Sequence, residues 1–559
     1  DLLGHRSLTV IQETVELIQR NKGLSIDVEH LPDPDKLTAD LIRNARTIGC
    51  FQIESPAMRA LLKSVRADNT DMLIKTLSLI RPGPSGSGMK KHFIDRHLGL
   101  VDLVYLHPAL EKVLGDTYGV MLYQEDILKV ANVIAGMNLA EADALRRAMT
   151  KKRTAKEMAK SMKLFLEKAK ANGVGEKEAE AIWGLMANFA EYSYCKAHAS
   201  TYGEIAYQCS YLKAHFPAEF LASVLSNRGG FYYPAVYLEE ARRSGIGIYP
   251  ADVNRSEFNY TAEGDAIRVG FLEIRNLTQN AVRSILAARK TEPFQGIADL
   301  CRRANLTYAD AEVLIQAGAC DGLRGSRPVF PKPACEGMSG HATSQQLESA
   351  ESRFWKNRPT SLEMLWELKT IFQTAGREAA LDERLLFPYD RSDAVLPHLP
   401  DYSRKKRTDL EWNHYGLLIS KHPIEYHVPA MLDRPRVLSE DMPAYAGDTV
   451  TMVGWLIAER RVGLKGRGAM KFLTFEDPAG VFEAVLFPKV YQQYGHLLTS
   501  HGPYFITGEV QDEDGYNSLI ADHVERVGHN KKSPRHSDIT PPLHWIFPYL
   551  REDSLTHAD

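Results

Sequence analysis

The sequence predicts a multidomain α+β protein, with a largely helical N-terminal half and a small β-barrel near the C-terminus. The chain has 559 residues, of which 44% are apolar and 25% charged, which is enough for roughly three or four globular domains. Apolar residues recur at helical spacing through most of the first 245 positions. Between 448 and 526 the pattern changes to five short runs with strand character.

Most of the predicted helices lie in the first half of the chain. In residues 7–21 the apolar positions fall on one face, and Ser7 is expected to cap the N-terminus. Further amphipathic helices are predicted at 55–66, 105–135, 139–150, 154–172, 176–190, 201–227 and 235–245. Ser55 is a suitable N-cap for the first of these, and Pro217 predicts a hinge within the longest late helix.

The other segments carry different patterns. Residues 82–88 have the sequence Pro-Gly-Pro-Ser-Gly-Ser-Gly and must form a loop. Residues 246–275 are β-like, and helices are predicted around 278–289 and 308–317. Residues 321–360 are rich in Gly, Pro and Ser, which is typical of a linker or loose insertion. The five late runs are TVTMVGWLIA, MKFLTFED, VFEAVLF, YFITGEV and NSLIADHVERV, and together they predict a small closed barrel.

Composition excludes several classes of protein. No apolar run approaches the roughly 20 residues of a membrane span, and no secretory signal opens the chain. The six cysteines are scattered without a C-x-x-C pair, which favours reduced thiols in the cytoplasm over disulfides or a zinc site. A formal net charge of −3 does not by itself indicate nucleic acid, so any such site must be a local patch.

The strongest local patch is a cluster of cations within eleven residues: Arg146, Arg147, Lys151, Lys152, Arg153 and Lys156. Such a cluster repels itself and usually indicates a polyanion nearby. The alternative is a helix C-terminus, whose dipole favours cations.

A second candidate phosphate site is the Gly/Ser loop, which has Arg81 before it and Lys90 and Lys91 after it. Glycine lets backbone N–H groups approach an anion, and the flanking cations add charge. A plain connector is an equally good interpretation, because a lone Gly-rich loop is a weak signal.

Residues 194–203, Tyr-Cys-Lys-Ala-His-Ala-Ser-Thr-Tyr-Gly, combine aromatic and cationic side chains. Lys196 with the tyrosines suits base stacking and phosphate contact. Cys195 and His198 have the spacing of a nucleophile pair, but no third orienting group is evident. Packing at a helix N-terminus is therefore the favoured interpretation. Gln124, Glu125 and Asp126 are polar within an apolar helix and face either a cleft or solvent.

Taken together, these segments resemble the bacterial DNA polymerases of family C, which are the alpha subunit of DNA polymerase III and its error-prone relatives. The resemblance rests on DLLGHRSLTVIQ, TIGCFQIES, LIRPGPSGSGMKKHFIDR, YGVMLYQEDILKVANVIAGMNLAEADALRRAMTKKR, YCKAHASTYGEIAYQCSYLKAHFPAEF and GIGIYPADVN. They occur in the family's order within residues 1–260. Later residues match more loosely, down to a barrel similar to the family's OB domain.

The resemblance implies a nucleotidyltransferase that uses two Mg²⁺ ions on three palm carboxylates. Asp1 takes the position of the third carboxylate, and the rest of the palm, the thumb and a metallophosphoesterase-like domain are expected to be missing. One carboxylate alone cannot hold a two-metal centre. The implied phosphate-binding residues are Arg146 and Arg147 at the triphosphate, with Lys151 and Lys152 nearby, Arg81, Lys90 and Lys91 flanking the pocket or template, and Lys196 and His198 in the fingers motif.

The implied domains are a palm remnant (1–8), polymerase fingers (9–260), a helix-hairpin-helix and clamp-binding-like region (261–430), an OB-like domain (431–530) and a tail (531–559). In the OB-like domain five cations cluster around a Gly-rich loop, namely Arg460, Arg461, Lys465, Arg467 and Lys471. Trp455, Phe472 and Phe475 lie on adjoining strands, and cations with aromatics on such a barrel suit a single-stranded template. At least half of these aromatics are expected to be barrel core.

Two departures from the family pattern change what is expected. The helix-hairpin-helix turn at 274–279 lacks both usual glycines, so phosphate contact there is not expected beyond a partial substitution by Arg275. The clamp-binding peptide corresponds to residues 383–387, where Glu383 replaces the usual glutamine, so binding of a sliding clamp is not expected.

The expected function is therefore template-directed DNA synthesis in replication or error-prone repair. Its expected partners are primer–template DNA, dNTPs and other replication or repair subunits, without a membrane. This chain alone is expected to bind these ligands but to polymerise poorly or not at all. The alternatives are a non-catalytic DNA-binding remnant or scaffold, and a helical protein that binds some other phosphate ligand.

Overall fold

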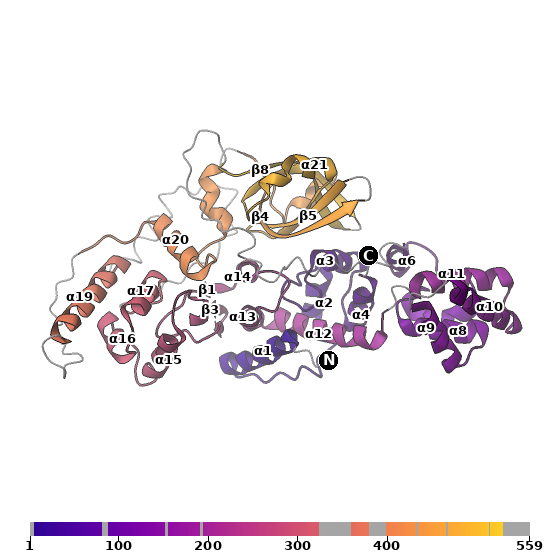
Figure 1. Ribbon diagram of the computed structural model, residues 1–559, viewed down its shortest axis with the longest axis horizontal. Helices are drawn as coiled ribbons and strands as arrows, with labels where there is room; N and C mark the ends of the chain where they lie inside the picture. The colour runs from indigo at the N-terminus through magenta and orange to yellow at the C-terminus, as the bar shows by residue number, and fades with distance from the viewer. Residues whose placement is uncertain are drawn as a thin grey trace. The chain divides into compact units, whose positions relative to one another are not determined.

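The computed structural model describes residues 5–80, 88–150, 155–190, 194–323, 359–379, 398–431, 434–464, 468–513 and 515–528 (Figure 1). The chain divides into two compact units, one built from 1–26, 216–512 and 517–559, and the other from 27–215 with 513–516. Among the described helices, none combines the length and the apolar character that crossing a membrane requires.

One half of the second unit is organised around a long helix, α12 (Lys196–His215), which packs against α2 (Lys36–Arg43) and α4 (Thr70–Leu79). The close approach of α12 to α4 depends on Gly203, because a side chain at this position would collide with Ile74. The predicted N-cap of the helix at 55–66 is confirmed: α3 (Pro56–Val65) begins after Ser55, whose side chain accepts a hydrogen bond from the Met58 N–H.

The other half of this unit is a helical bundle with one apolar core. It contains α7 (Glu111–Leu114), α8 (Gln124–Ala135), α9 (Leu139–Thr150), α10 (Ala155–Ala171) and α11 (Glu176–Ala190). Ile127, Met149, Phe165 and Trp183 lie in its core. The helix α6 (Met89–His97) contacts α3 and adjoins the bundle core through Met89. Figure 1 shows α8, α9, α10 and α11 grouped together.

The predicted single helix over 105–135 is wrong. Short turns at Pro108–Leu110 and Gly115–Thr117 flank α7, and the chain then leaves the helical conformation before α8 begins. Tyr118 and Gly119 have φ values of 54° and 74°, in the left-handed region that ends a helix. The Asp126 carboxylate accepts hydrogen bonds from the N–H groups of Leu122 and Tyr123, at 3.0 and 2.9 Å, and so defines the new start.

The first unit begins with α1 (Arg6–Lys22), which packs on α13 (Pro217–Asn227). The predicted Ser7 N-cap is wrong, because the helix starts one residue earlier and Ser7 is buried within its first turn. The predicted break at Pro217 is confirmed, since α12 ends at His215. After α14 (Pro234–Arg243), the strands β1 (Gly247–Tyr249), β2 (Thr261–Glu263) and β3 (Ala266–Arg268) form a sheet of order β1-β3-β2.

Further helices follow this sheet in the same unit. They are α15 (Gln279–Ala288), α16 (Ile297–Arg303), α17 (Tyr308–Gln316), α19 (Ser361–Ala379) and α20 (Arg404–Tyr415). The helices predicted at 278–289 and 308–317 correspond to α15 and α17. The sequence pattern missed α16 because this helix has only 7 residues, less than two turns in which to show a periodicity.

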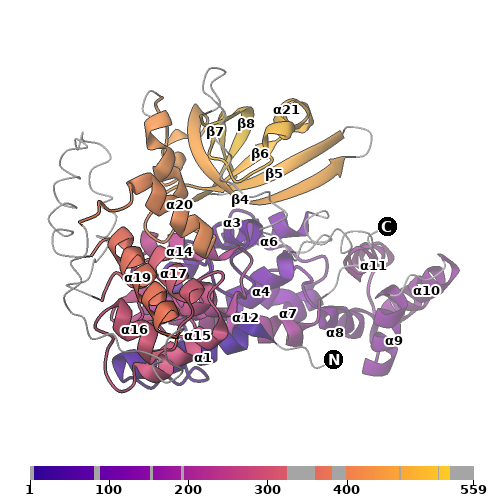
Figure 2. The same cartoon turned by 60° about the vertical axis from the view of Figure 1, so that its left-hand side comes forward.

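The predicted five-stranded closed barrel is confirmed. Its strands are β4 (Thr449–Leu464), β5 (Gly468–Glu476), β6 (Val481–Leu486), β7 (Tyr504–Glu513) and β8 (Tyr516–Arg526), in the order β4-β5-β6-β8-β7. Leu473, Phe475 and Tyr504 fill its core, and α21 (Pro488–Tyr494) packs against β5 and β6. Figure 2 shows that β4 and β5 extend together beyond the rest of the barrel.

Candidate nucleotide and nucleic-acid site

The arginine pair of α9 is organised by one carboxylate on the same helix. Arg146 Nη2 lies 2.8 Å from Asp143 Oδ1, and Arg147 Nη2 lies 2.5 Å from Asp143 Oδ2. Hydrogen bonds from Arg146 and then Arg147 hold the pKa of Asp143 below its ordinary value, so the carboxylate stays ionised. Because two guanidinium groups share one carboxylate, the cluster of Asp143, Arg146 and Arg147 keeps a net positive charge. The Arg147 side chain is 66% exposed and the Arg146 side chain 22%.

Arg146 is also tied to the segment that precedes α12. Its Nη1 donates to Gln124 Oε1 at 3.3 Å. The backbone N–H of Gln124 in turn donates to the Tyr194 carbonyl at 2.7 Å, and Tyr123 and Tyr194 form an isolated parallel β-bridge. The structure therefore brings the arginine cluster and the 194–203 motif together through the start of α8.

Glu125 completes this junction by capping α12. Its carboxylate accepts the backbone N–H of Lys196 at 3.1 Å and lies 3.6 Å from Cys195 Sγ. A carboxylate at a helix N-terminus is stabilised by the unpaired N–H groups and the helix dipole. The Lys196 ammonium lies 5.3 Å from the centre of the Tyr123 ring.

His198, on α12, packs between the rings of two tyrosines. Its ring centre lies 5.3 Å from that of Tyr194 and 4.1 Å from that of Tyr202. Phe51 extends this aromatic row, with its ring centre 5.0 Å from Tyr202. Cys195 faces Glu125, so the contacts of both residues fit packing at a helix N-terminus, the interpretation favoured from the sequence.

The lysines of α6 lie on a helix that packs on the same bundle core. Met89, just before Lys90, packs against the core that contains Met149 of α9. Lys91 is exposed, and its ammonium lies 3.3 Å from Asp95 Oδ1. The other cations predicted for this site, Arg81, Lys151 and Lys152, lie outside the described residues.

The predicted metal ligand, Asp1, also lies outside the described residues. Within the part of the chain that the structure describes, no group of three or more His, Cys, Asp or Glu side chains is arranged to hold a metal ion. The described residues therefore do not form a two-metal centre, and no chemical step is assigned to one.

The barrel distributes its predicted cations over two faces. In the β4–β5 ladder Arg461 is opposite Lys471, and Arg460 is opposite Phe472, so the two arginines point to opposite sides. The Lys471 side chain is almost fully buried, and its ammonium lies 2.8 Å from Glu459 Oε2, which leaves little of it available to a nucleic acid. Lys465 and Arg467 lie outside the described residues.

The three barrel aromatics occupy different environments. Phe475 is in the barrel core. Trp455 is buried as well: its Nε1 donates to the Tyr233 hydroxyl at 3.1 Å, and its ring stacks on His501 with centres 5.8 Å apart. Phe472 is half-buried and opposite the exposed Arg460. Of the three, Phe472 is the one that retains exposed surface for stacking.

Two backbone N–H groups of the turn at 274–279 are hydrogen bonded to other parts of the protein. The N–H of Arg275 donates to the His414 carbonyl at 2.7 Å, and the N–H of Thr278 to Asp310 Oδ1 at 3.0 Å. The Arg275 guanidinium packs against Gly416. These contacts occupy two backbone N–H groups of the turn, and weak phosphate binding there stays a prediction. The segment at 383–387 lies outside the described residues.

Sequence reasoning did not assign Gln124, Glu125 and Asp143 their positioning roles. Asp143 was detectable, because it precedes Arg146 and Arg147 by three and four positions, the spacing of ion pairs on one helix face. Gln124 and Glu125 were noted only as polar residues, and their partners 22 and 71 positions away gave no local signal.

Comparisons with known proteins match three parts of the chain. Residues 7–173 match the bacterial DNA polymerase III alpha subunit finger domain. Residues 245–329 match a helix-hairpin-helix motif, and residues 450–527 match an OB-fold nucleic acid binding domain. These matches follow the order expected from the sequence motifs.

Full-length relatives agree with the domain matches. An error-prone DNA polymerase from Symbiobacterium thermophilum is 30% identical over 554 residues, which cover 94% of this chain and 49% of that protein. DNA polymerase III alpha subunits from Pseudomonas fluorescens and Pseudomonas aeruginosa are 33% and 34% identical, covering 94% and 92% of this chain and 45% and 44% of those proteins. The chain thus spans about half the length of these relatives. By the ordered motifs, the three domain matches and these relatives, the chain belongs to the bacterial family C DNA polymerases and carries matches to the finger domain, a helix-hairpin-helix motif and an OB-fold nucleic acid binding domain.

Proposed function

We propose that this chain binds the incoming nucleotide and the nucleic-acid strand in a DNA-directed DNA polymerase. The complete enzyme would transfer a nucleotidyl group from a dNTP to a primer 3′-hydroxyl in replication or error-prone repair. The observation that carries the proposal is the junction at Gln124, which joins Arg146 to the N-terminal end of α12. Two cationic motifs far apart in sequence thereby border one site.

Arg146 and Arg147 are proposed to bind the triphosphate. A guanidinium group donates two parallel hydrogen bonds to phosphate oxygens, and phosphoryl transfer needs positioning and charge stabilisation rather than a covalent nucleophile. Asp143 supports this role because it orients both guanidinium groups while neutralising only one charge. Arg81, Lys90, Lys91, Lys151 and Lys152 are proposed to surround the same phosphates or the template.

Lys196 and His198 are proposed to contact the nucleotide from α12. Both side chains are exposed, and the cap from Glu125 fixes the start of the helix that carries them. The neighbouring rings of Tyr194 and Tyr202 favour contact with a base or sugar.

Two Mg²⁺ ions, with Asp1 among their ligands, belong to the proposal for the complete enzyme. Such ions would stabilise the attacking and leaving oxygens. The domain boundaries implied by the family resemblance, with fingers over 9–260 and the OB-like domain over 431–530, are proposed with it.

The barrel is proposed to bind single-stranded template. Arg460 and Phe472 share an outward-facing part of the β4–β5 ladder, which suits a backbone contact beside a stacked base. Arg461 would contribute from the opposite side of the ladder. Lys465 and Arg467, which lie outside the described residues, are proposed to add to the cationic surface. Lys471 is paired with Glu459, so it would contribute mainly to the electrostatic potential of this region and little by direct contact.

Isothermal titration calorimetry tests the proposal. The purified chain is titrated with dATP and, separately, with inorganic tripolyphosphate. Arg146→Ala is expected to weaken both affinities by about tenfold, or ~1.4 kcal/mol. Arg283→Ala is the matched control, because it removes an exposed arginine on α15. Equal affinities for Arg146→Ala and Arg283→Ala would remove the assigned role of Arg146. Primer extension with and without an added dNTP mixture then measures whether the chain catalyses synthesis.

A further inference from the structure

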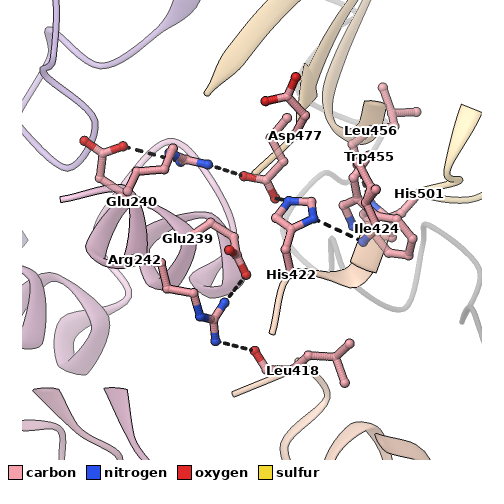
Figure 3. Close-up of polar contacts among 12 residues, drawn as sticks. Glu239, Glu240, Arg242, Leu418, His422, Ile424, Trp455, Leu456, Asp477 and His501 are labelled. Atoms are coloured by element: carbon pink, nitrogen blue, oxygen red, sulfur yellow. Dashed lines mark hydrogen bonds and ion pairs between the residues drawn. The ribbon is translucent and has the colours of Figure 1, made fainter. Parts of the chain in front are cut away.

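Helix α14 packs against the barrel through buried charged side chains, which we call the α14–barrel seam. It contains Glu239, Glu240, Arg242 and Arg243 from α14, His422 from the segment before the barrel, and Glu476 and Asp477 at the end of β5. Figure 3 labels five of these residues, namely Glu239, Glu240, Arg242, His422 and Asp477. Arg243 links the two sides, with its guanidinium 3.3 Å from Glu240 Oε2 and 3.5 Å from Glu476 Oε2.

Each arginine of the seam already has a carboxylate partner on its own helix. Arg242 pairs with Glu239 and also donates to the Leu418 carbonyl at 3.1 Å, and Arg243 pairs with Glu240. Glu476 therefore has only a share of Arg243. It lies at the end of β5, almost completely buried, in a seam where carboxyl groups outnumber guanidinium groups.

The Asp477 carboxylate accepts hydrogen bonds from residues other than the two arginines. It accepts the Ser439 N–H at 2.7 Å and the Ser439 hydroxyl at 2.6 Å. The N–H groups of Ala479 and Gly480 also donate to it, at 2.9 and 2.8 Å. Burial raises the pKa of Asp477, and these four donors oppose that shift by favouring the ionised form. Glu476 has fewer donors, so the excess negative charge of the seam is least stabilised there.

His422 faces Glu476 without a hydrogen bond. His422 Nδ1 accepts the N–H of Ile424 at 3.1 Å, which places the proton of a neutral ring on Nε2. Nε2 points towards Glu476 Oε1 at 3.9 Å. Both atoms are buried, and neither has a hydrogen-bond partner among the residues that the structure describes. Within the described part of the chain, Glu476 Oε1 is therefore a buried oxygen without a donor, which favours the protonated, neutral form of this carboxyl group.

The directions of the pKa shifts agree with this geometry. Burial, opposed by Arg243, raises the pKa of Glu476 to about 8. Burial, followed by the charges of Arg243 and Arg242, lowers the pKa of His422 well below its ordinary value. The other titratable groups around the seam are Tyr233 and His501, which contact Trp455, and Glu411 of α20, which is close to Arg242.

We infer that docking of the barrel on α14 is proton-linked: the docked seam holds a proton on Glu476, and loss of this proton weakens the docking. This inference is independent of the proposed nucleotide site. In an undocked barrel Glu476 would face water and return to its ordinary pKa, so docking takes up a proton. As far as Glu476 is concerned, docking is therefore strongest at a pH where this residue is protonated in both states, below its ordinary pKa of 4.5. It weakens as the pH rises towards about 8.

His422 contributes with the opposite sign. Its pKa is lowered in the docked seam, so docking loses strength as pH falls below its ordinary value of 6.5. Between pH 4.5 and 6.5 the two effects oppose each other, and between 6.5 and about 8 His422 no longer opposes the effect of Glu476. The distinctive consequence is a loosening of the seam across this upper interval.

Trp455 is a built-in reporter, because it is the ladder partner of Glu476 and packs on Tyr233 and His501. The full chain, labelled with fluorotryptophan at its six tryptophans, is titrated by ¹⁹F NMR from pH 6 to 9, with the Trp455 signal assigned from Trp455→Phe. We expect the Trp455 signal to titrate with a midpoint near pH 8 while the Trp183 signal stays constant.

Glu476→Gln mimics the protonated carboxyl and is expected to abolish the titration of Trp455 in this range. Glu525→Gln is the matched control, since it neutralises a barrel carboxylate that pairs with Arg434 outside the seam, and it is expected to titrate like the parent. A Glu476→Gln chain that titrates like the parent would overturn the inference. A parent signal that is unchanged from pH 6 to 9 would also overturn it, without need of any variant.

Discussion

The guanidinium of Arg146 donates a hydrogen bond to the side-chain oxygen of Gln124, which lies 22 positions earlier in the chain. The same glutamine binds the Tyr194 carbonyl through its backbone N–H. One residue thus connects the cationic end of α9 to the start of α12. Without this link the arginine pair would be a charged helix end, and with it the pair borders an organised cationic and aromatic surface.

Loss of the Gln124 side chain should loosen Arg146 without removing any charge. We expect Gln124→Ala to weaken binding of tripolyphosphate by about threefold to tenfold, because one hydrogen bond to a charged group is lost. Gln12→Ala, an exposed glutamine on α1, is the control and should leave the affinity unchanged. Titration calorimetry measures both. If Gln124→Ala binds as tightly as the parent, Gln124 does not position the arginine.

The exposed pair on the β4–β5 ladder should determine binding of single strands. We expect Phe472→Ala to weaken binding of a dT oligonucleotide by about 1 kcal/mol or more, since one stacking contact is lost. Phe482→Ala is not a suitable control because Phe482 is in the barrel core, so Arg460→Ala is used to separate stacking from charge. Fluorescence anisotropy at two salt concentrations distinguishes them: the charge effect should shrink with salt and the stacking effect should persist.

The contact between α12 and α4 depends on a glycine. We expect Gly203→Ala to destabilise the unit that contains these helices by about 1–3 kcal/mol, because the added methyl group collides with Ile74. Gly184→Ala on α11 is the matched control, since a methyl group there meets no atom within 4 Å. That control should be neutral or stabilise by up to about 1 kcal/mol. Urea denaturation followed by circular dichroism measures both, and equal midpoints would contradict the prediction.

A buried lysine holds the loop that leads to α3. Lys213 Nζ donates to the carbonyls of Arg46 and Ile48, each at 2.7 Å. We expect Lys213→Met to lower the free energy of unfolding by about 2–4 kcal/mol, because it leaves these carbonyl acceptors without the lysine donor. Lys160→Met, at an exposed position of α10, should change stability by less than about 0.5 kcal/mol. The shift in thermal midpoint decides between these outcomes.

Much of the fold could be predicted from the sequence where the signal was local. Helices at 139–150, 154–172 and 176–190 agree with α9, α10 and α11, because each has several turns of apolar periodicity. Alternation over five runs predicted the barrel. Prediction failed where a short turn interrupts a run of apolar residues. The helix over 105–135 is broken by left-handed residues at Tyr118 and Gly119, and apolar side chains on both sides of the break hid it.

The site was predicted only in part. The sequence indicated the cations of α9 and α12 and the cations and aromatics of β4 and β5. It did not indicate that Lys471 is held by Glu459, or that Trp455 is buried against Tyr233, 222 positions away. Residue type and spacing show which side chains can bind a phosphate or stack on a base. They do not show which of these side chains the fold uses for its own packing.

The order of the segments, their periodicities and the positions of the cationic motifs depend on residues close together in the chain, so they could be predicted from the sequence. Closure of the barrel pairs β4 with β7 and β6 with β8, and it was predicted only from the number of strand-like runs. That Gln124 joins Arg146 to Tyr194, and that Glu476 is buried between Arg243 and His422, follows only from the tertiary structure, because hydrogen bonding and electrostatic interactions depend on distance in space. Arg243 and Glu476 are 233 positions apart in the chain and meet only when the barrel is docked.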